Sequence, residues 1–241
     1  DIIQTEINDY KLFVLPKTSI GKQILINKLF EVNDTQYLKK IIKNNWNIID
    51  IGANIGHYTM LFSKFSPNGK IFAVEPVDYH QNMIELSSWS NSFSNIKICK
   101  NIISDKDEML DFCISEDGAF SSMIDTNRVR TERKVKIQSL TLDTFLEFEK
   151  INEDIDFLKI DAEGAEKLIL LGGENSFKTK KIKIIMIEMY DKNYTVYNTS
   201  CDEIDSIFKK YGYKGFFIKD GMKIKYDSSF SNISLNVFYE I

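Results

Sequence analysis

Apolar runs and helical patterns alternate along the chain from about residue 48. Short, continuously apolar runs at residues 48–51, 70–75 and 96–100 predict strands, and residues 57–65 and 78–89 between them carry apolar positions at helical spacing. Continuously apolar strands that are separated by helices are typical of a parallel sheet covered on both faces. The pattern therefore predicts an α/β fold.

The middle of the chain interrupts this alternation. Residues 109–115 and 134–138 have strand patterns, and the small and polar residues 118–123 lie between them. We interpret this segment as a β-hairpin insertion with a flexible tip, a kind of loop that often covers a binding site.

The alternation then resumes and continues to the end of the chain. The predicted elements are strands at 155–161, 182–188, 213–218 and 235–239 and helices at 141–148, 165–171 and 202–211. Residues 1–45 precede the alternation and predict a lead-in with one strand at 10–15 and two helices at 24–30 and 37–42. We therefore expect a lead-in at residues 1–45 and a single domain at residues 46–241.

Acidic residues stand at the ends of four predicted strands: Asp50, Glu75, Asp161 and Glu188. In an open parallel sheet, ligands bind beyond the carboxyl ends of the strands. An acid at this position faces the crevice, because the apolar interior of the strand cannot accept it. Four such acids predict a site that handles hydroxyls, an ammonium group or a proton. The alternative is that strand ends simply tolerate polar residues.

A glycine turn with the sequence DIGANIG follows the first of these strands, from Asp50 to Gly56. Gly52 and Gly56 permit tight backbone geometry, and the start of the next helix offers unpaired N–H groups. Glu75 ends the next strand, where a carboxylate can accept both hydroxyls of a ribose. The fingerprint G-x-G-x-x-G is absent, and an acid before the first glycine disfavours a pyrophosphate. The turn therefore favours S-adenosylmethionine, which carries positive charge, over NAD.

Four motifs occur in a fixed order: DIGANIG at 50–56, VEP at 74–76, TLD at 141–143 and KIDAEGAE at 159–166. Together they resemble the FkbM family of S-adenosylmethionine-dependent methyltransferases, over roughly residues 45–190. The resemblance implies a Rossmann-like class I methyltransferase fold, with a seven-stranded, mostly parallel sheet whose last strand is antiparallel. It also implies mostly O-methylation of small molecules, often sugars, polysaccharide units or natural products.

The resemblance also implies roles for the residues that match its motifs. Glu75 is expected to hold the ribose of the cofactor, and Ser104 with Asp105 is expected to lie beside the adenine. Asp161 and Glu163 are expected where the methyl acceptor binds, and Ser121 and Ser122 near the active site. The methionine part of the cofactor is expected among four residues of the glycine turn: Asp50, Gly52, Asn54 and Gly56.

An alcohol is a poor nucleophile while it keeps its proton, so transfer to a hydroxyl needs a general base. Asp161 is the first candidate because it ends a strand within the KIDAEGAE motif, and Glu163 and Glu188 are the alternatives. A rival hypothesis is that these three acids share a divalent cation, but we predict no metal site. Lys159 is expected only to pair with a nearby acid.

Composition narrows the range of partners and of cellular locations. The net charge of −4 and the lack of a basic, aromatic stripe disfavour nucleic acid as a partner. The three cysteines are far apart, which disfavours structural zinc and suits a reducing compartment. No signal peptide and no apolar run of about 20 residues is visible. We expect a cytoplasmic protein with a small-molecule or glycan acceptor and no membrane insertion.

Two other classes of protein remain open on the sequence alone. An NAD-dependent oxidoreductase would have the same type of fold, but its fingerprint G-x-G-x-x-G is absent from this sequence. A non-catalytic cofactor-binding module could also use the same fold, although every motif acid and glycine is present. The sequence does not define the oligomeric state.

Overall fold

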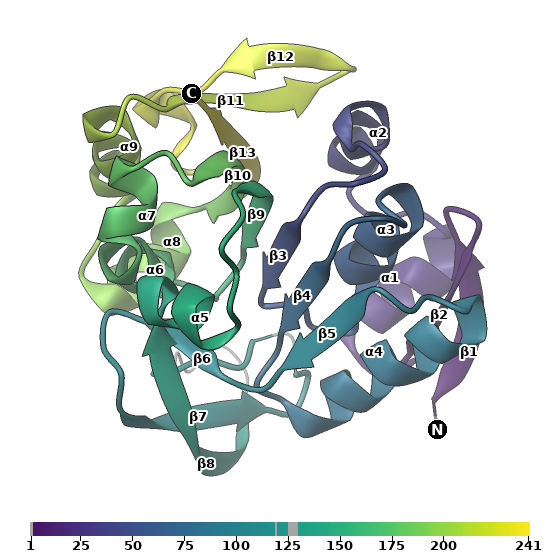
Figure 1. Cartoon of the computed structure of the whole chain (residues 1–241). Coiled ribbons are helices and arrows are strands. Elements are labelled where there is room, and N and C mark those ends of the chain that lie inside the picture. The colour runs from purple at the N-terminus through teal and green to yellow at the C-terminus, as the bar shows by residue number, and fades with distance from the viewer. Residues whose placement is uncertain (1, 119, 125–129) are drawn as a thin grey trace.

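The computed structural model describes residues 2–118, 120–124 and 130–241 (Figure 1). Its main feature is an eight-stranded sheet with the order β12-β11-β13-β10-β9-β3-β4-β5. The strands are β3 (Ile48–Ile51), β4 (Ile71–Val74), β5 (Ile96–Cys99), β9 (Ile155–Ile160), β10 (Ile182–Met189), β11 (Lys214–Lys219), β12 (Met222–Lys225) and β13 (Leu235–Glu240).

The expected count of seven strands is wrong by one. The extra strand is β12, which folds back on β11 through Asp220 and Gly221, both with positive φ. The last strand, β13, is antiparallel to both of its neighbours, β10 and β11. β12 was missed because it is short and half polar, and it lies at the edge of the sheet, where only one neighbour covers it.

Helices cover both faces of the sheet, as the apolar pattern of the strands predicts (Figure 1). Alternate residues of β3 enter different cores, because successive side chains of a strand point to opposite faces. Ile49 belongs to the core with α5 (Leu142–Phe148), α6 (Glu166–Gly172), α7 (Glu174–Lys178) and α9 (Cys201–Lys210). Ile48 belongs to the core with α3 (His57–Phe65) and α4 (Asp78–Asn91).

The lead-in packs on the α3 side of the sheet. It forms a hairpin of β1 (Ile3–Ile7) and β2 (Tyr10–Val14), followed by α1 (Ser19–Asn27) and α2 (Val32–Ile41). The predicted strand and both predicted helices are present. Each helix begins five residues earlier than expected, and Thr18 caps α1 by accepting a hydrogen bond from the Gly21 N–H. β1 was not predicted.

The predicted hairpin insertion is part of a separate three-stranded sheet with the order β6-β8-β7. β7 (Met109–Ser115) and β8 (Thr131–Thr141) are antiparallel, and β6 (Ile102–Ser104) pairs with the end of β8. The expected flexible tip at 118–123 includes Ala119, which lies outside the described residues. The remaining helical turns are α8 (Asp191–Tyr194), η1 (Thr195–Tyr197) and η2 (Ser228–Phe230). Within the described residues, no helix has the length and apolar character to cross a membrane.

Candidate active site

The four strand-end acids stand on four adjacent strands. Glu188 is in β10, Asp161 follows β9, Asp50 is in β3 and Glu75 follows β4, which is also their order across the sheet. A cavity lies at these strand ends, with the hairpin sheet on one side. Six of the predicted site residues line it: Gly52, Asn54, Glu75, Ser121, Asp161 and Glu163. The other six are not among the described residues on its wall: Asp50, Gly56, Ser104, Asp105, Ser122 and Glu188.

Close backbone contacts explain the glycines of the turn. Gly52 has φ +73°, and a Cβ atom there would lie 1.8 Å from the carbonyl oxygen of Asp161. Gly56 has φ +86°, and a Cβ atom there would lie 2.8 Å from Cγ1 of Ile84 on α4. The turn is therefore wedged between the end of β9 and α4, where a side chain at either glycine would displace it.

Glu75 is fixed at one end of the cavity by backbone amides. Its Oε2 accepts a hydrogen bond from the Asn54 N–H at 2.7 Å, and its Oε1 accepts one from the Val77 N–H at 2.9 Å. The Nδ1 atom of His80 lies 3.4 Å from Oε1. The side chain is almost fully buried yet lines the cavity. Each carboxylate oxygen has two lone pairs, so Glu75 can still accept hydrogen bonds from hydroxyls in the cavity.

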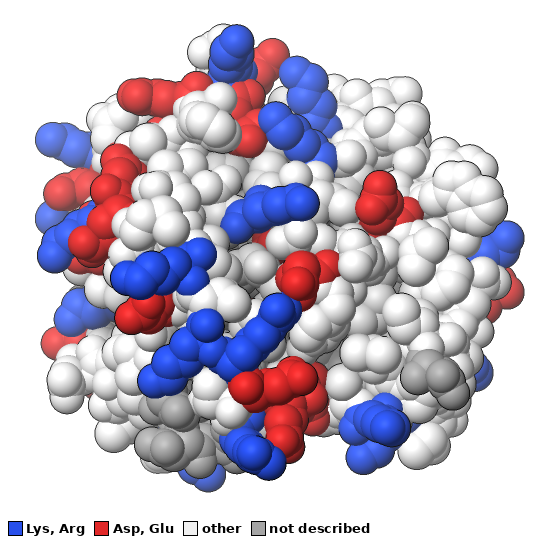
Figure 2. All heavy atoms as spheres, turned by 90° about the horizontal axis from the view of Figure 1, so that it is seen from below, with Lys and Arg blue, Asp and Glu red and all other residues white. Residues whose placement is uncertain are grey.

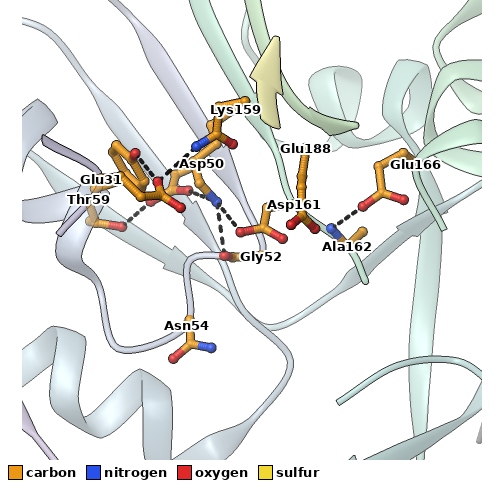
Figure 3. A network of polar contacts seen from close by, with 12 residues as sticks. Glu31, Asp50, Gly52, Asn54, Thr59, Lys159, Asp161, Ala162, Glu166 and Glu188 are labelled. Carbon is orange, nitrogen blue, oxygen red and sulfur yellow. Dashed lines mark hydrogen bonds and ion pairs between the residues drawn. The ribbon is translucent and has the colours of Figure 1, made fainter. Parts of the chain in front are cut away.

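Asp50 is buried inside the protein. Its Oδ2 accepts a hydrogen bond from the Thr59 hydroxyl at 2.6 Å, and its Oδ1 lies 3.5 Å from Nζ of Lys159 (Figure 3). Asp50 and Lys159 face each other in the β3–β9 register, which brings the pair together. Burial raises the pKa of Asp50, and Lys159 and Thr59 offset part of that rise. A direct contact with the methionine part of a cofactor stays a prediction for this residue.

Lys159 is a buried cation on the cavity wall. Its Nζ lies 3.3 Å from the Gly52 carbonyl oxygen and 3.3 Å from Oδ2 of Asp161. Burial lowers the pKa of Lys159. The nearby carboxylates of Asp161, Asp50 and Glu31 together raise it by more, so the pKa lies above its ordinary value. Lys159 is therefore charged, and its expected pairing with a nearby acid is confirmed.

The three candidate bases are in different surroundings. The Asp161 side chain is 39% exposed and lines the cavity, as does Glu163. The Glu188 carboxylate instead accepts hydrogen bonds from Ser234 at 2.7 Å and Asn193 at 3.1 Å, and Glu188 lines a second hollow. Across the described ranges, no three His, Cys, Asp or Glu side chains are grouped to hold a metal ion.

Three functional candidates escaped the sequence predictions. The Tyr58 hydroxyl donates a hydrogen bond to Glu31, a lead-in residue whose pKa burial raises to about 7. Glu166 is almost fully buried, and its Oε1 accepts a hydrogen bond from the Ala162 N–H at 2.8 Å. Burial raises the pKa of Glu166 to about 8. Glu166 is the last residue of the KIDAEGAE motif, so the motif could have identified it as a candidate. No local sequence pattern identifies Glu31 or Tyr58.

Another part of the cavity wall is apolar. It is formed by Val74, Ile102, Ile103 and Phe112, and Asn101 adds a polar group. Ser104 lies one residue beyond this wall and donates a hydrogen bond to Asp105 at 3.2 Å. The preceding residues Asn101–Ile103 thus line the cavity, whereas Ser104 and Asp105 lie just beyond it. A contact of Ser104 or Asp105 with adenine stays a prediction.

These residues fit S-adenosylmethionine. The apolar part of the wall suits a flat aromatic base, and Glu75 suits the two hydroxyls of a ribose. Asp161 and Glu163 bring negative charge to another part of the cavity wall, which suits a positively charged group such as the sulfonium. Gly52 of the glycine turn brings backbone without a side chain to the cavity wall.

Solved structures of other proteins share the fold at low sequence identity. Precorrin-6y C5,15-methyltransferase from Geobacter metallireducens GS-15 is 13% identical, with 88% of this chain and 87% of that chain covered and a TM-score of 0.50. Trm5b from Pyrococcus abyssi is 10% identical, with 99% of this chain and 55% of that chain covered and a TM-score of 0.52. These likenesses confirm the predicted α/β methyltransferase fold. No curated protein matches the sequence.

The sequence match is more specific than the likeness of fold. The profile described as "Methyltransferase FkbM domain" matches residues 50–214, which is more than half of the chain. The match begins at Asp50, at the start of the glycine turn, and includes Glu75, Asp161 and Glu166. The chain belongs to the FkbM methyltransferase family, with S-adenosylmethionine as its cofactor.

Proposed function

We propose that the protein transfers a methyl group to a hydroxyl of a small molecule or of a sugar unit. The observation that carries this proposal is an accessible carboxylate, Asp161, on the wall of the cavity beside Lys159. The cofactor supplies a methyl group on a sulfonium, which is already a good leaving group. The residues of this chain then have two tasks: to hold the two reactants in line and to accept a proton.

Glu75 and the glycine turn would hold the cofactor. Glu75 is prepared to accept ribose hydroxyls because its carboxylate is already fixed by the Asn54 and Val77 amides. Ile103 and Phe112 provide apolar surface for the adenine. Ser104 and Asp105 would then support this end from outside the wall.

Asp161 would accept the proton of the attacking hydroxyl as the new O–C bond forms. The Lys159 ammonium, 3.3 Å away, compensates the negative charge of the carboxylate. Glu163 also lines the cavity and is the next candidate. Glu188 is the weakest candidate because its carboxylate contacts Ser234 and Asn193 beside another hollow.

The charge distribution favours a small or neutral acceptor over nucleic acid. The net charge is −4, and Figure 2 shows Lys and Arg interspersed with Asp and Glu on the face below the β6–β8 sheet. A nucleic-acid enzyme usually presents a continuous basic surface to the phosphates. A cytoplasmic location stays a prediction.

The test compares Asp161→Asn with Asp111→Asn, a matched control at an exposed acid paired with Lys136. Both variants and the wild type are incubated with radiolabelled S-adenosylmethionine and a panel of methyl glycosides. We expect Asp161→Asn to lower turnover by about 10²–10⁴-fold while its affinity for S-adenosylhomocysteine stays within a few-fold of wild type. Full activity of Asp161→Asn would remove the residue from the mechanism. Label that reaches amines but no hydroxyl would contradict O-methylation.

A further inference from the structure

A short turn presents two acids of the KIDAEGAE motif to the cavity. It occupies residues 161–164, between the end of β9 and the start of α6. Asp161, Ala162 and Glu163 line the cavity from this turn. Glu163 has φ +53°, a left-handed backbone conformation that is uncommon for residues other than glycine. Contacts with the surrounding structure must therefore hold the turn in this conformation.

Glu166 supplies one of these contacts from inside the protein. It is the first residue of α6, and only 1% of its surface is exposed. Its Oε1 accepts a hydrogen bond from the Ala162 N–H at 2.8 Å, so its side chain reaches back across the turn (Figure 3). The Asp161 N–H donates a hydrogen bond to the Ile51 carbonyl oxygen at 3.1 Å. Both amides that flank the Cα atom of Asp161 are thus fixed, which sets the direction in which its side chain leaves the backbone.

A carboxyl group at this buried position is unfavourable for folding. Among the described residues, Oε2 of Glu166 has no hydrogen-bond partner. Burial, and to a smaller extent the charges of Glu188 and Asp161, raise the pKa of Glu166 to about 8. An apolar side chain of similar size would avoid this cost, but it could not accept a hydrogen bond from Ala162. What Glu166 contributes is therefore a hydrogen-bond acceptor at one defined place.

We propose that Glu166 is a positioning residue for the methyl transfer, because through the Ala162 amide it holds the Asp161 carboxylate in reach of the acceptor hydroxyl. This inference rests on the proposed function, in which Asp161 accepts the proton. A misplacement of about 1 Å can cost about 10²-fold in rate. The Lys159 ammonium, 3.3 Å from Oδ2 of Asp161, holds the other end of the same side chain. Glu166 thus fixes the backbone of the base, and Lys159 fixes its carboxylate.

Two substitutions separate the acceptor atom of Glu166 from the bulk of its side chain. Glu166→Leu fills a similar volume but offers no acceptor to the Ala162 N–H. Glu166→Gln is the matched control, since it keeps a carbonyl oxygen and resembles the uncharged acid in shape. Each variant is incubated with radiolabelled S-adenosylmethionine and a methyl glycoside that the wild type methylates. Affinity for S-adenosylhomocysteine and urea denaturation are measured on the same samples.

We expect Glu166→Leu to lower kcat about 10- to 100-fold, with KM for the glycoside, the affinity for S-adenosylhomocysteine and the urea midpoint close to wild type. Glu166→Gln should recover most of kcat. Wild-type kcat in Glu166→Leu, or an equal loss in Glu166→Gln, would overturn the inference. So would a kcat that falls only in step with the fraction of folded protein, because that is a structural effect.

A double variant shows whether Glu166 acts through Asp161. Residues that act as a unit have effects that do not add, so Glu166→Leu combined with Asp161→Asn should turn over at about the rate of Asp161→Asn alone. A further loss of about tenfold or more in the double variant would mean that Glu166 acts by another route. No label on any glycoside by the wild type, with S-adenosylhomocysteine still bound, would overturn the proposed function and this inference together.

Hydrogen exchange of the wild-type protein tests the contact without turnover and without a variant. The Ala162 N–H is held by a buried carboxyl group, so we expect it to exchange with solvent about 10²-fold more slowly than the same amide in an unfolded chain. Exchange at the rate of an unfolded chain would overturn the positioning role of Glu166 even if Glu166→Leu failed to fold, and O-methylation would stand.

Discussion

The two ends of the charged part of the cavity are built in opposite ways. At one end, Glu75 is held by backbone amides of neighbouring loops, from Asn54 and Val77. At the other end, Lys159 lies beside Asp50, which comes from the distant strand β3, and beside Asp161, two residues further along the chain (Figure 3). The Glu75 end thus depends on local loop geometry, whereas the Lys159 end depends on the balance of buried charges.

This difference predicts different responses to substitution. Removing a hydrogen-bonding group at the Glu75 end should weaken ligand binding with little effect on folding. Removing the cation at the Lys159 end should leave buried carboxylates without compensation, which affects folding itself. Gly52 joins the two ends, because its amide contacts β4 and its carbonyl oxygen accepts a hydrogen bond from Lys159.

Gly52→Ala should have the largest effect because it disturbs both ends. Its new Cβ would lie 1.8 Å from the Asp161 carbonyl oxygen, so we expect the free energy of unfolding to fall by about 4 kcal/mol or more. Gly221→Ala is the control, since Gly221 has φ +76° and, among the described residues beyond its chain neighbours, no atom lies within 4 Å of the added Cβ. It should lose only about 1 kcal/mol, the strain of positive φ. Urea denaturation measures both, and equal losses would contradict the close contact.

Lys159→Met should have the next largest effect. It removes the cation beside Asp50, which is fully buried. We therefore expect the free energy of unfolding to fall by about 3 kcal/mol. Lys167→Met is the control because Lys167 pairs with Glu203 at the surface, where the loss should stay below about 1 kcal/mol. If both variants unfold at the same urea concentration, the charge balance at this end is not needed for stability.

Glu166→Gln should change how stability depends on pH. Burial raises the pKa of Glu166 to about 8 from its ordinary 4.5, so the folded protein keeps a proton that the unfolded chain releases between these values. The free energy of unfolding therefore falls as pH rises through this window, by at most about 1.4 kcal/mol per pH unit from this group. Glu166→Gln should flatten the curve between pH 5 and 8, as measured by denaturation at several pH values. An unchanged slope would mean that Glu166 titrates normally.

Glu75→Gln should have the smallest effect on folding and should act on binding. Gln keeps one carbonyl oxygen for the Asn54 or Val77 amide but loses the charge and the second acceptor. We expect affinity for S-adenosylhomocysteine to fall about 10- to 100-fold, as loss of charged hydrogen bonds does, with the urea midpoint nearly unchanged. Calorimetric titration measures the affinity, and Glu116→Gln at the exposed Arg130 pair is the control. Wild-type affinity in Glu75→Gln would exclude a ribose contact.

The same contrast explains what could be predicted from sequence. The turn from Asp50 to Gly56 and the acid Glu75 follow from local patterns, because strand periodicity and glycine geometry act over a few residues. The Lys159 end could be predicted only in part. Asp161 and Glu166 lie in a recognisable motif, but Tyr58 and Glu31 are 27 residues apart and meet only in the folded chain.

Tertiary pairing also explains the errors in the fold. The edge strand β12 and the short strands β1 and β6 have weak patterns, since neighbours rather than propensity hold them in place. Ser104 and Asp105 are predicted to lie beside the adenine, and the preceding residues, Asn101–Ile103, line the cavity. A one- or two-residue offset of this kind depends on how β6 pairs with β8, which the sequence alone does not specify.

The most direct test of the account is a thermal-shift titration of the wild-type protein with S-adenosylhomocysteine, run beside NADH. A ligand bound only by the folded state at 100 times its dissociation constant adds about 2.7 kcal/mol of stability. The account predicts a clear rise in Tm with S-adenosylhomocysteine, no rise with NADH and a reduced rise for Glu75→Gln. A rise with NADH alone, or no rise with S-adenosylhomocysteine in a folded sample, would contradict the assignment of this cavity to the cofactor.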